Sequence, residues 1–350
     1  MTETTYRGTG FTESRRPSEH PKLSRRIQRR FRNFRRAVYG VFYRILYWVL
    51  PRLPPWSIRL MGRLLVVPIS RLLHRRTAEA NLVKVYGDEL SAAERDRILA
   101  GMFRGLPEFL VECIGAINQG TDYLRGRVED TSVKKLVMDL EARSERGWIG
   151  VSPHLGNWVL LASWASTIPG DRGLCRAIAK RQPNPHLSAI LDHAQNRMGF
   201  VSVYSDGSPV QVVGQCLKLL KGGGRLGVAA DQDMSKVPGV FIEFLGHRAY
   251  TPTGPAMLAL TADVPILPLA LIRKGDGKQL EVIHGDLIFP DQSRTHSRQE
   301  ETLRLTKAWS AAMETMIHAH KDQWAWFHKR WKTTPESLAA RARGRGGEAT

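Results

Sequence analysis

The chain has 350 residues, of which 42% are hydrophobic, and a formal net charge of +19 at pH 7. This length accommodates one large domain or two modest ones around a buried core. The three cysteines lie far apart and form no Cys-x-x-Cys pair, which argues against a zinc site and against a disulfide framework. The basic excess favours an anionic partner, either a nucleic acid or a membrane surface.

The N-terminal segment carries much of the positive charge. Residues 1–23 are polar and are predicted to be a disordered tail. Residues 37–50 are apolar, but at about 14 residues they are shorter than the roughly 20 that a membrane span needs. Their aromatic side chains are of the types enriched at lipid headgroups: Tyr39, Phe42, Tyr43, Tyr47 and Trp48. We expect residues 24–50 to form a basic helix leading into an interfacial anchor. A helix packed on the main domain and a tilted single span are the alternatives.

Residues 24–115 are predicted to be a helical, membrane-associated region, in which Ser91-Ala-Ala-Glu94 has the form of a capping box. Beyond about residue 130, short β-rich runs alternate with helical ones. The predicted strands are 147–152, 174–178, 201–204, 225–230, 265–272 and 279–284, and the predicted helices are 157–167, 185–198, 209–221, 252–262 and 298–320. This alternation predicts an α/β domain over residues 116–335, with a mixed, mostly parallel sheet flanked by helices. Residues 336–350, rich in Ala, Arg and Gly, are predicted to be a disordered basic tail.

A histidine follows the first predicted strand of this domain, in the stretch Val151-Ser-Pro-His-Leu-Gly-Asn-Trp-Val159. At the end of a strand and the mouth of a helix, His154 is well placed to act as a general base. Gly156 allows close approach of the backbone, and the next helix offers free N–H groups for an oxyanion. Asn157 could orient the imidazole without supplying charge.

Two acids, Asp231 and Asp233, flank Gln232 at the end of another apolar strand, the sheet edge where α/β proteins bind ligands. A turn or a helix cap is the structural alternative for them. Near the C-terminus, the segment Trp324–Lys332 interleaves aromatic and basic residues, as single-stranded nucleic-acid sites do. No other nucleic-acid signature is present, so we favour a basic, aromatic rim around a lipid headgroup. A C-terminal helix packed on the sheet is compatible with both the nucleic-acid interpretation and the lipid-headgroup interpretation of this segment.

Several motifs together carry a family resemblance. They are His154-Leu-Gly-Asn-Trp158, Asn184-Pro185 with Arg197 and Gly199, Asp231-Gln-Asp233, Thr251-Pro-Thr-Gly254 and Trp324–Lys332. Their order over residues 36–335 resembles the lauroyl and myristoyl acyltransferases of lipid A synthesis, which have a glycerolipid acyltransferase-like fold. The resemblance implies that His154 and Asp231 are catalytic. It also implies that Arg197, Asp233, Asn157 and Gly156 bind substrate.

This resemblance also implies a reaction and a location. The expected reaction transfers a fatty acyl chain from a thioester to a hydroxyl of an anionic lipid such as a lipid A precursor. The donor would be acyl-acyl carrier protein or acyl-CoA, with no metal and no further cofactor. Expected partners are anionic membrane lipid and acyl carrier protein, with no nucleic acid, at the cytoplasmic face of the cell inner membrane.

The chain departs from the family at one position. Members typically have an acid five residues after the histidine, which orients the imidazole and stabilises its charged form. Val159 occupies that position here. Three readings follow: another acid, from Asp231, Asp233 and Glu112, reaches His154; the enzyme works slowly without an orienting acid; or the fold is kept for binding lipid or acyl carrier without turnover.

Overall fold

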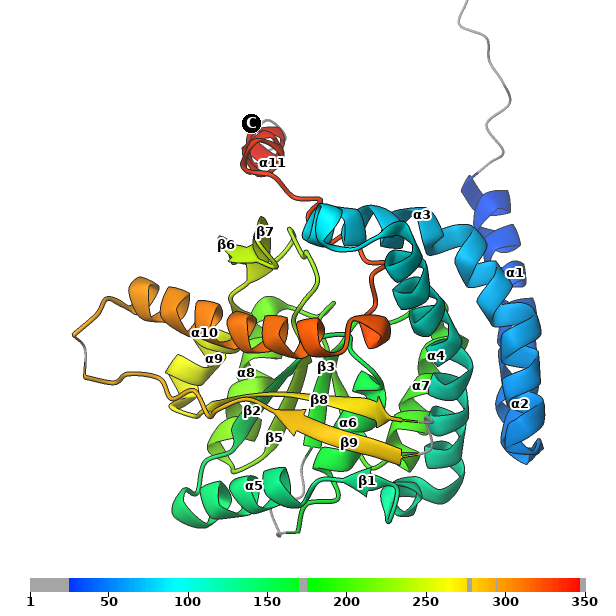
Figure 1. The fold of residues 1–350 in the computed structure, drawn as a ribbon, viewed down its shortest axis with the longest axis horizontal. Coiled ribbons are helices and arrows are strands. Elements are labelled where there is room, and N and C mark those ends of the chain that lie inside the picture. Colours follow the sequence, from blue (N-terminus) through cyan, green and yellow to red (C-terminus); the bar gives the residue numbers. More distant parts are fainter. Residues whose placement is uncertain (1–24, 170–174, 276–278, 294, 347–350) are drawn as a thin grey trace, which may run out of the picture.

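The structure, a computed structural model, describes residues 25–169, 175–275, 279–293 and 295–346. The tail predicted at residues 1–23 lies outside the described residues. The N-terminal part is helical, as expected (Figure 1). Its helices are α1 (Arg25–Val49), α2 (Pro55–Met61), α3 (Val67–Tyr86) and α4 (Ala92–Gln119). Short 3₁₀ segments follow α1 (Leu50–Arg52) and α3 (Gly87–Glu89), and a π-helical turn (Gly62–Val66) continues α2 into α3. The capping box opens α4, since Ser91 Oγ accepts from the Glu94 N–H and Ser91 N–H donates to the Glu94 carboxylate.

Seven strands of the described residues form one sheet in the order β1-β9-β8-β2-β5-β3-β4. They are β1 (Val128–Glu129), β2 (Trp148–Ser152), β3 (Cys175–Ala179), β4 (Val201–Tyr204), β5 (Arg225–Ala229), β8 (Ile266–Lys274) and β9 (Gln279–His284). Strands β8, β2, β5, β3 and β4 run parallel, whereas β9 is antiparallel to β8. The predicted mixed, mostly parallel sheet is therefore confirmed. A separate antiparallel hairpin, β6 (Gly239–Phe244) and β7 (His247–Pro252), was not predicted.

Helices cover both faces of the sheet. Along β8, Leu267, Leu269 and Leu271 face a core with α5 (Thr131–Arg143), α6 (Trp158–Ala165) and α7 (Pro185–Arg197). Ile266 points the opposite way, into a core with α8 (Pro209–Lys221), α9 (Gly254–Ala262) and α10 (Arg298–Ala319). This alternation follows from the period of two along a strand. All five residues of β2 are buried, as a central strand covered on both faces requires.

The N-terminal helices pack on the domain with one side only. Helix α1 lies against α7, where Tyr47 meets the His193 ring at 5.7 Å and Asn184 Nδ2 donates to the Arg36 carbonyl. Other apolar side chains of α1–α3 are exposed, and we call them the apolar N-terminal face: Phe34, Val38, Phe42, Ile45, Trp48, Trp56, Leu60, Leu64, Leu65, Ile69, Leu72 and Leu73. No helix in the described ranges combines the length and apolarity needed to cross a bilayer.

The predicted C-terminal tail needs a correction. Residues 336–346 were expected to be disordered, but they belong to a helix, α11 (Pro335–Gly346), that projects from the domain (Figure 1). Thr334 begins it, because its Oγ1 accepts from the Ser337 N–H at 3.2 Å. Alanine, leucine and arginine have high helix propensity, which explains why this composition forms a helix.

Candidate active site

His154 and Asp231 meet at the carboxyl edge of the sheet. Strands β2 and β5 are parallel neighbours, and Ser152 at the end of β2 pairs with Ala229 at the end of β5. His154 and Asp231 each follow two residues later, so the strand register brings them side by side. The Nδ1 atom of His154 lies 2.5 Å from Asp231 Oδ1, and the His154 N–H donates to Asp231 Oδ2 at 2.8 Å. Of the three candidate acids, Asp231 is the one that reaches the imidazole.

Asp231 is held as a buried carboxylate, with its side chain only 1% exposed. Burial by itself would raise the pKa of Asp231. The neighbouring His154 ring, its hydrogen bond, and the indole N–H of Trp324 at 2.7 Å outweigh burial and hold the pKa well below its usual range. Because Asp231 is ionised, the proton in the short contact belongs to His154 Nδ1. In the neutral form of the ring, Nε2 then holds the lone pair, as a general base requires.

The Nε2 side of His154 faces two further side chains. Gln232 Nε2 lies 3.1 Å from His154 Nε2 and 3.2 Å from His328 Nε2. The two imidazole rings meet edge to face, with centroids 4.9 Å apart. Burial, and then the nearby His154, lower the pKa of His328 to about 4, so His328 is neutral at physiological pH. The Trp158 ring lies 4.9 Å from that of His154 and completes an aromatic wall with Phe109.

The turn that carries His154, residues 153–157, is fixed by backbone contacts. Gly156 has φ +59°, and a Cβ there would lie 2.0 Å from the Leu271 carbonyl oxygen of β8. Only glycine combines this conformation with so close an approach. The Gly156 N–H donates to the Gln323 carbonyl, and the His154 carbonyl accepts from the Ala325 N–H at 3.0 Å. The segment after α10 therefore braces the turn.

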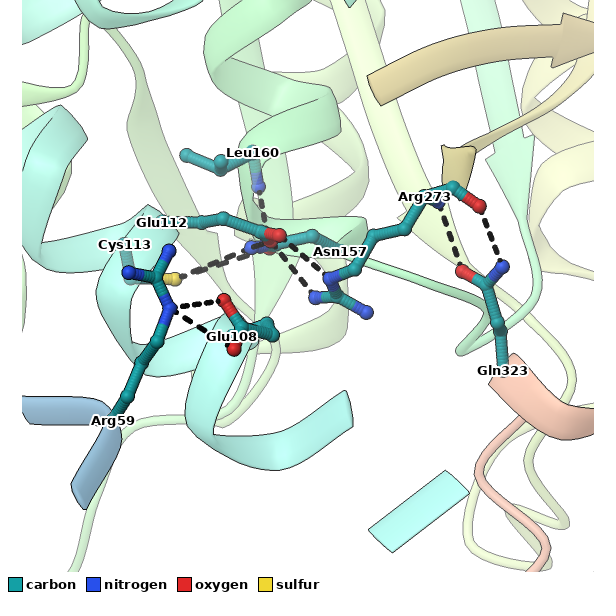
Figure 2. Close-up of polar contacts among 8 residues, drawn as sticks. All are labelled: Arg59, Glu108, Glu112, Cys113, Asn157, Leu160, Arg273 and Gln323. Carbon is teal, nitrogen blue, oxygen red and sulfur yellow. Dashed lines mark hydrogen bonds and ion pairs between the residues drawn. The ribbon is translucent and has the colours of Figure 1, made fainter. Parts of the chain in front are cut away.

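Asn157 contacts a buried acid rather than the imidazole (Figure 2). Its Nδ2 donates to Glu112 Oε2 at 2.7 Å, and its Oδ1 accepts from the Leu160 N–H as the N-cap of α6. Glu112, 5% exposed, also accepts from Arg273 Nε at 2.6 Å and Nη2 at 2.8 Å. Gln323 in turn pairs with both backbone groups of Arg273. This network ties the His154 turn to α4, β8 and the segment after α10.

Val159, on α6, is partly buried and packs against the apolar core that α6 shares with its neighbours. Valine cannot accept a hydrogen bond from the imidazole, and Asp231 occupies the Nδ1 side of His154. The orienting acid here thus comes from the end of the neighbouring strand.

Two other predicted residues make contacts away from His154. Arg197 donates from Nε to the Ile117 carbonyl at 3.0 Å and from Nη2 to the Asn118 carbonyl at 2.8 Å, so it satisfies the C-terminal carbonyls of α4. Asp233 accepts from the N–H and the hydroxyl of Thr333. These contacts hold elements together, and the substrate-binding roles of Arg197 and Asp233 stay predictions.

The interpretation of Trp324–Lys332 as an interfacial rim is wrong for two of its three tryptophans and for Arg330. Trp324 and Trp326 are buried, and Arg330 is 1% exposed. Arg330 donates to the Tyr250 carbonyl and to Thr251 Oγ1, and burial lowers its pKa to about 10. The segment is not a helix either, because the chain folds back over the site here. Aromatic residues with polar tips bury readily when their N–H groups find acceptors, as Trp324 does on Asp231.

Sequence reasoning did not assign roles to Gln232 and His328. Gln232 stands between the two predicted aspartates, and that position was the available signal. His328 gave none, because its approach depends on a fold-back far along the chain. In the described part of the chain, no group of three or more His, Cys, Asp or Glu side chains is arranged to hold a metal ion.

Residues 26–333 match the family of bacterial lipid A biosynthesis acyltransferases. The chain belongs to this family. It is also 32% identical over 127 residues to the lipid A biosynthesis lauroyltransferase of Escherichia coli (strain K12), a stretch that covers 36% of this chain and 39% of that relative. The similarity thus spans about two fifths of the lauroyltransferase.

Proposed function

We propose that this protein is an acyltransferase that moves a fatty acyl chain from a thioester donor to a hydroxyl of an anionic lipid. The observation that carries the proposal is the 2.5 Å contact between His154 Nδ1 and the buried Asp231 carboxylate. It keeps the ring proton on Nδ1, so that Nε2 can take the hydroxyl proton, and it stabilises the imidazolium that forms. Family membership supports a lipid A precursor as the acceptor and lipid A biosynthesis as the setting.

In the proposed reaction, the acceptor oxygen bonds to the thioester carbonyl carbon while its proton moves to His154 Nε2. The tetrahedral intermediate then collapses, the carbon–sulfur bond breaks, and the proton passes to the leaving sulfur. An ester and a free thiol result, with no change in oxidation state. Acyl-acyl carrier protein and acyl-CoA both offer this thioester, and an acidic carrier protein complements the basic chain.

The apolar N-terminal face supports membrane association. So many large apolar side chains exposed on three successive helices indicate an interaction site. A lipid bilayer fits it best, because arginines such as Arg35, Arg63 and Arg71 flank the apolar side chains and can meet lipid phosphates. Helix α3 also contacts the active-site segment, since Asn81 Nδ2 donates to the carbonyls of Trp326 and His328. These contacts support our proposal that the protein lies at the cytoplasmic face of the inner membrane, with the site beside the lipid surface.

A matched pair of variants tests the membrane face. Leu72→Asp replaces a side chain that is 86% exposed on α3, and Val210→Asp replaces one that is 81% exposed on α8. Inserting a leucine side chain into lipid is worth about 1.5–3 kcal/mol, so Leu72→Asp should weaken vesicle binding by roughly tenfold or more. Flotation with phosphatidylethanolamine–phosphatidylglycerol vesicles measures this. Equal loss in the two variants would argue against a localised lipid contact.

The second candidate function is lipid or acyl-carrier binding without turnover, which Val159 suggests. The Asp231 contact favours turnover over it, because the imidazole has a carboxylate partner despite Val159.

Acyl transfer from labelled acyl-acyl carrier protein and from labelled acyl-CoA into total membrane lipid decides between these functions. Wild type, His154→Ala and the control His296→Ala, which changes an exposed histidine outside the site, should be compared. We expect transfer in wild type and control and none in His154→Ala, with the labelled lipid identifying the acceptor. Transfer that persists in His154→Ala would contradict the proposed mechanism. No transfer in any protein, with lipid binding intact, would favour the binding function.

A further inference from the structure

One amide nitrogen, Gln232 Nε2, stands between two imidazole rings. It lies 3.1 Å from His154 Nε2 and 3.2 Å from His328 Nε2. Primary amide nitrogens carry two hydrogens and accept no hydrogen bond, so both contacts require a lone pair on the imidazole side.

The hydrogen-bond partners of both rings are compatible with this requirement. Asp231 accepts the Nδ1 proton of His154, so in the neutral form of that ring, the form that can act as a base, Nε2 holds the lone pair. His328 is neutral at physiological pH and can present a lone pair to the second hydrogen. The opposite orientation of the amide would place its carbonyl oxygen against the lone pair of His154. The Gln232 nitrogen is therefore directed at the base.

The position that Gln232 occupies is the one that a reacting hydroxyl needs. A hydroxyl that gives its proton to His154 must lie about 2.6–3.2 Å from Nε2. When the acceptor enters, it replaces the amide as the partner of Nε2. One N–H of Gln232 is then without a partner, directly beside the reacting atoms, while His328 still holds the other.

We propose that Gln232 is a catalytic residue whose freed N–H donates to the thioester oxygen as that oxygen becomes negative, with His328 as its positioning residue. This inference deepens the proposed acyl transfer and rests on it. As the acceptor oxygen bonds to the carbonyl carbon, the carbonyl π pair moves onto its oxygen and the hydroxyl proton moves to His154 Nε2. The electron pair returns as the carbon–sulfur bond breaks, and the thiol sulfur takes the proton.

The decisive variant is Gln232→Met, which keeps the length of the side chain and removes both donors. Loss of one oxyanion donor lowers kcat by about 10²–10³-fold, so we expect a loss of this size with KM little changed. Gln211→Met, an exposed change on α8, is the matched control. His328→Phe should lower kcat by a smaller factor, and His328→Gln should recover part of it, because the glutamine carbonyl can accept from Gln232. A structural role for His328 would not distinguish these two substitutions.

A second measurement is independent of turnover. In protein labelled with ¹⁵N-histidine, the Nε2 resonances of His154 and His328 should both move in Gln232→Met and stay in place in Gln211→Met. If wild type transfers no acyl chain, the proposed function fails, while the spectra still test the double donation by Gln232. Unmoved resonances would overturn the inference. So would a Gln232→Met enzyme with wild-type kcat, or one in which only KM changes, because the amide would then merely fill the empty hydroxyl position.

Discussion

Asp231→Asn is expected to lower kcat by about 10³–10⁴-fold, a barrier increase of about 4–5 kcal/mol, while leaving the shape of the site intact. In the wild type, Oδ2 accepts from two donors, the His154 N–H and the Trp324 indole, and Oδ1 accepts from His154 Nδ1. An asparagine must place its NH₂ group at one of these positions. At the Oδ2 position the NH₂ group would face two N–H donors, those of the His154 backbone and the Trp324 indole. At the Oδ1 position it would face only His154 Nδ1.

The ring therefore changes tautomer in Asp231→Asn. His154 Nδ1 becomes the acceptor and Nε2 carries the proton, so Nε2 cannot take one from the substrate. Glu141→Gln is the matched control. Glu141 is also buried, and it accepts from a tryptophan indole, that of Trp148, and from Arg225. The Glu141→Gln variant should be less stable in thermal unfolding but should keep its kcat per folded molecule. Acyl transfer at saturating thioester measures kcat for Asp231→Asn and for Glu141→Gln. If Asp231→Asn lost no more activity than Glu141→Gln, Asp231 would not orient the base.

Three further outcomes are expected. Val159→Glu should lower the free energy of unfolding by about 1–3 kcal/mol, because it places a carboxylate against the apolar core. It should not raise activity, because Asp231 already contacts the imidazole. Thermal unfolding and acyl transfer test these two expectations. Gly156→Ala should cost at least about 1–2 kcal/mol for its left-handed backbone alone and abolish turnover, since its Cβ would strike the Leu271 carbonyl; near-wild-type stability would contradict this. Folding lowers the pKa of His328 to about 4, so between about pH 4 and 6.5 the unfolded chain binds a proton that the folded chain does not. The free energy of unfolding should therefore rise with pH across this range, by up to about 3 kcal/mol. His328→Gln should flatten that slope in denaturant titrations.

The strands and helices with a regular apolar pattern could be predicted from the sequence. The bounds of β4, β9 and α8 agree with the predicted ranges because turn residues flank each apolar run. The pairing of His154 with Asp231 could be anticipated only as one of three options. It depends on β2 and β5 being neighbours in register, and strand order follows from long-range packing rather than from local pattern.

Other features depended on contacts that local pattern does not encode. Strand β1 has two residues and gives no periodic signal. Asp233 stands two residues after Asp231, yet it bonds to Thr333, which is 100 residues away in sequence. The burial of Trp324 and Trp326 reversed the expected surface role, because their indole N–H groups find acceptors inside the protein. Composition alone could not distinguish that arrangement from an interfacial one.

The brace on the His154 turn has a consequence for how the protein matures. Gln323, Trp324, Ala325 and His328 all follow the sheet in the chain, whereas the apolar face lies at its N-terminal end. Because synthesis proceeds from the N-terminus, the helices of the apolar N-terminal face leave the ribosome long before the residues that fix the His154 turn. A nascent chain that already holds His154 and Asp231 still lacks the Trp324 indole, the backbone groups of Gln323 and Ala325, and the His328 imidazole. The contacts that fix the His154 turn are thus completed only once residues 323–328 have been made, long after the helices of the apolar N-terminal face.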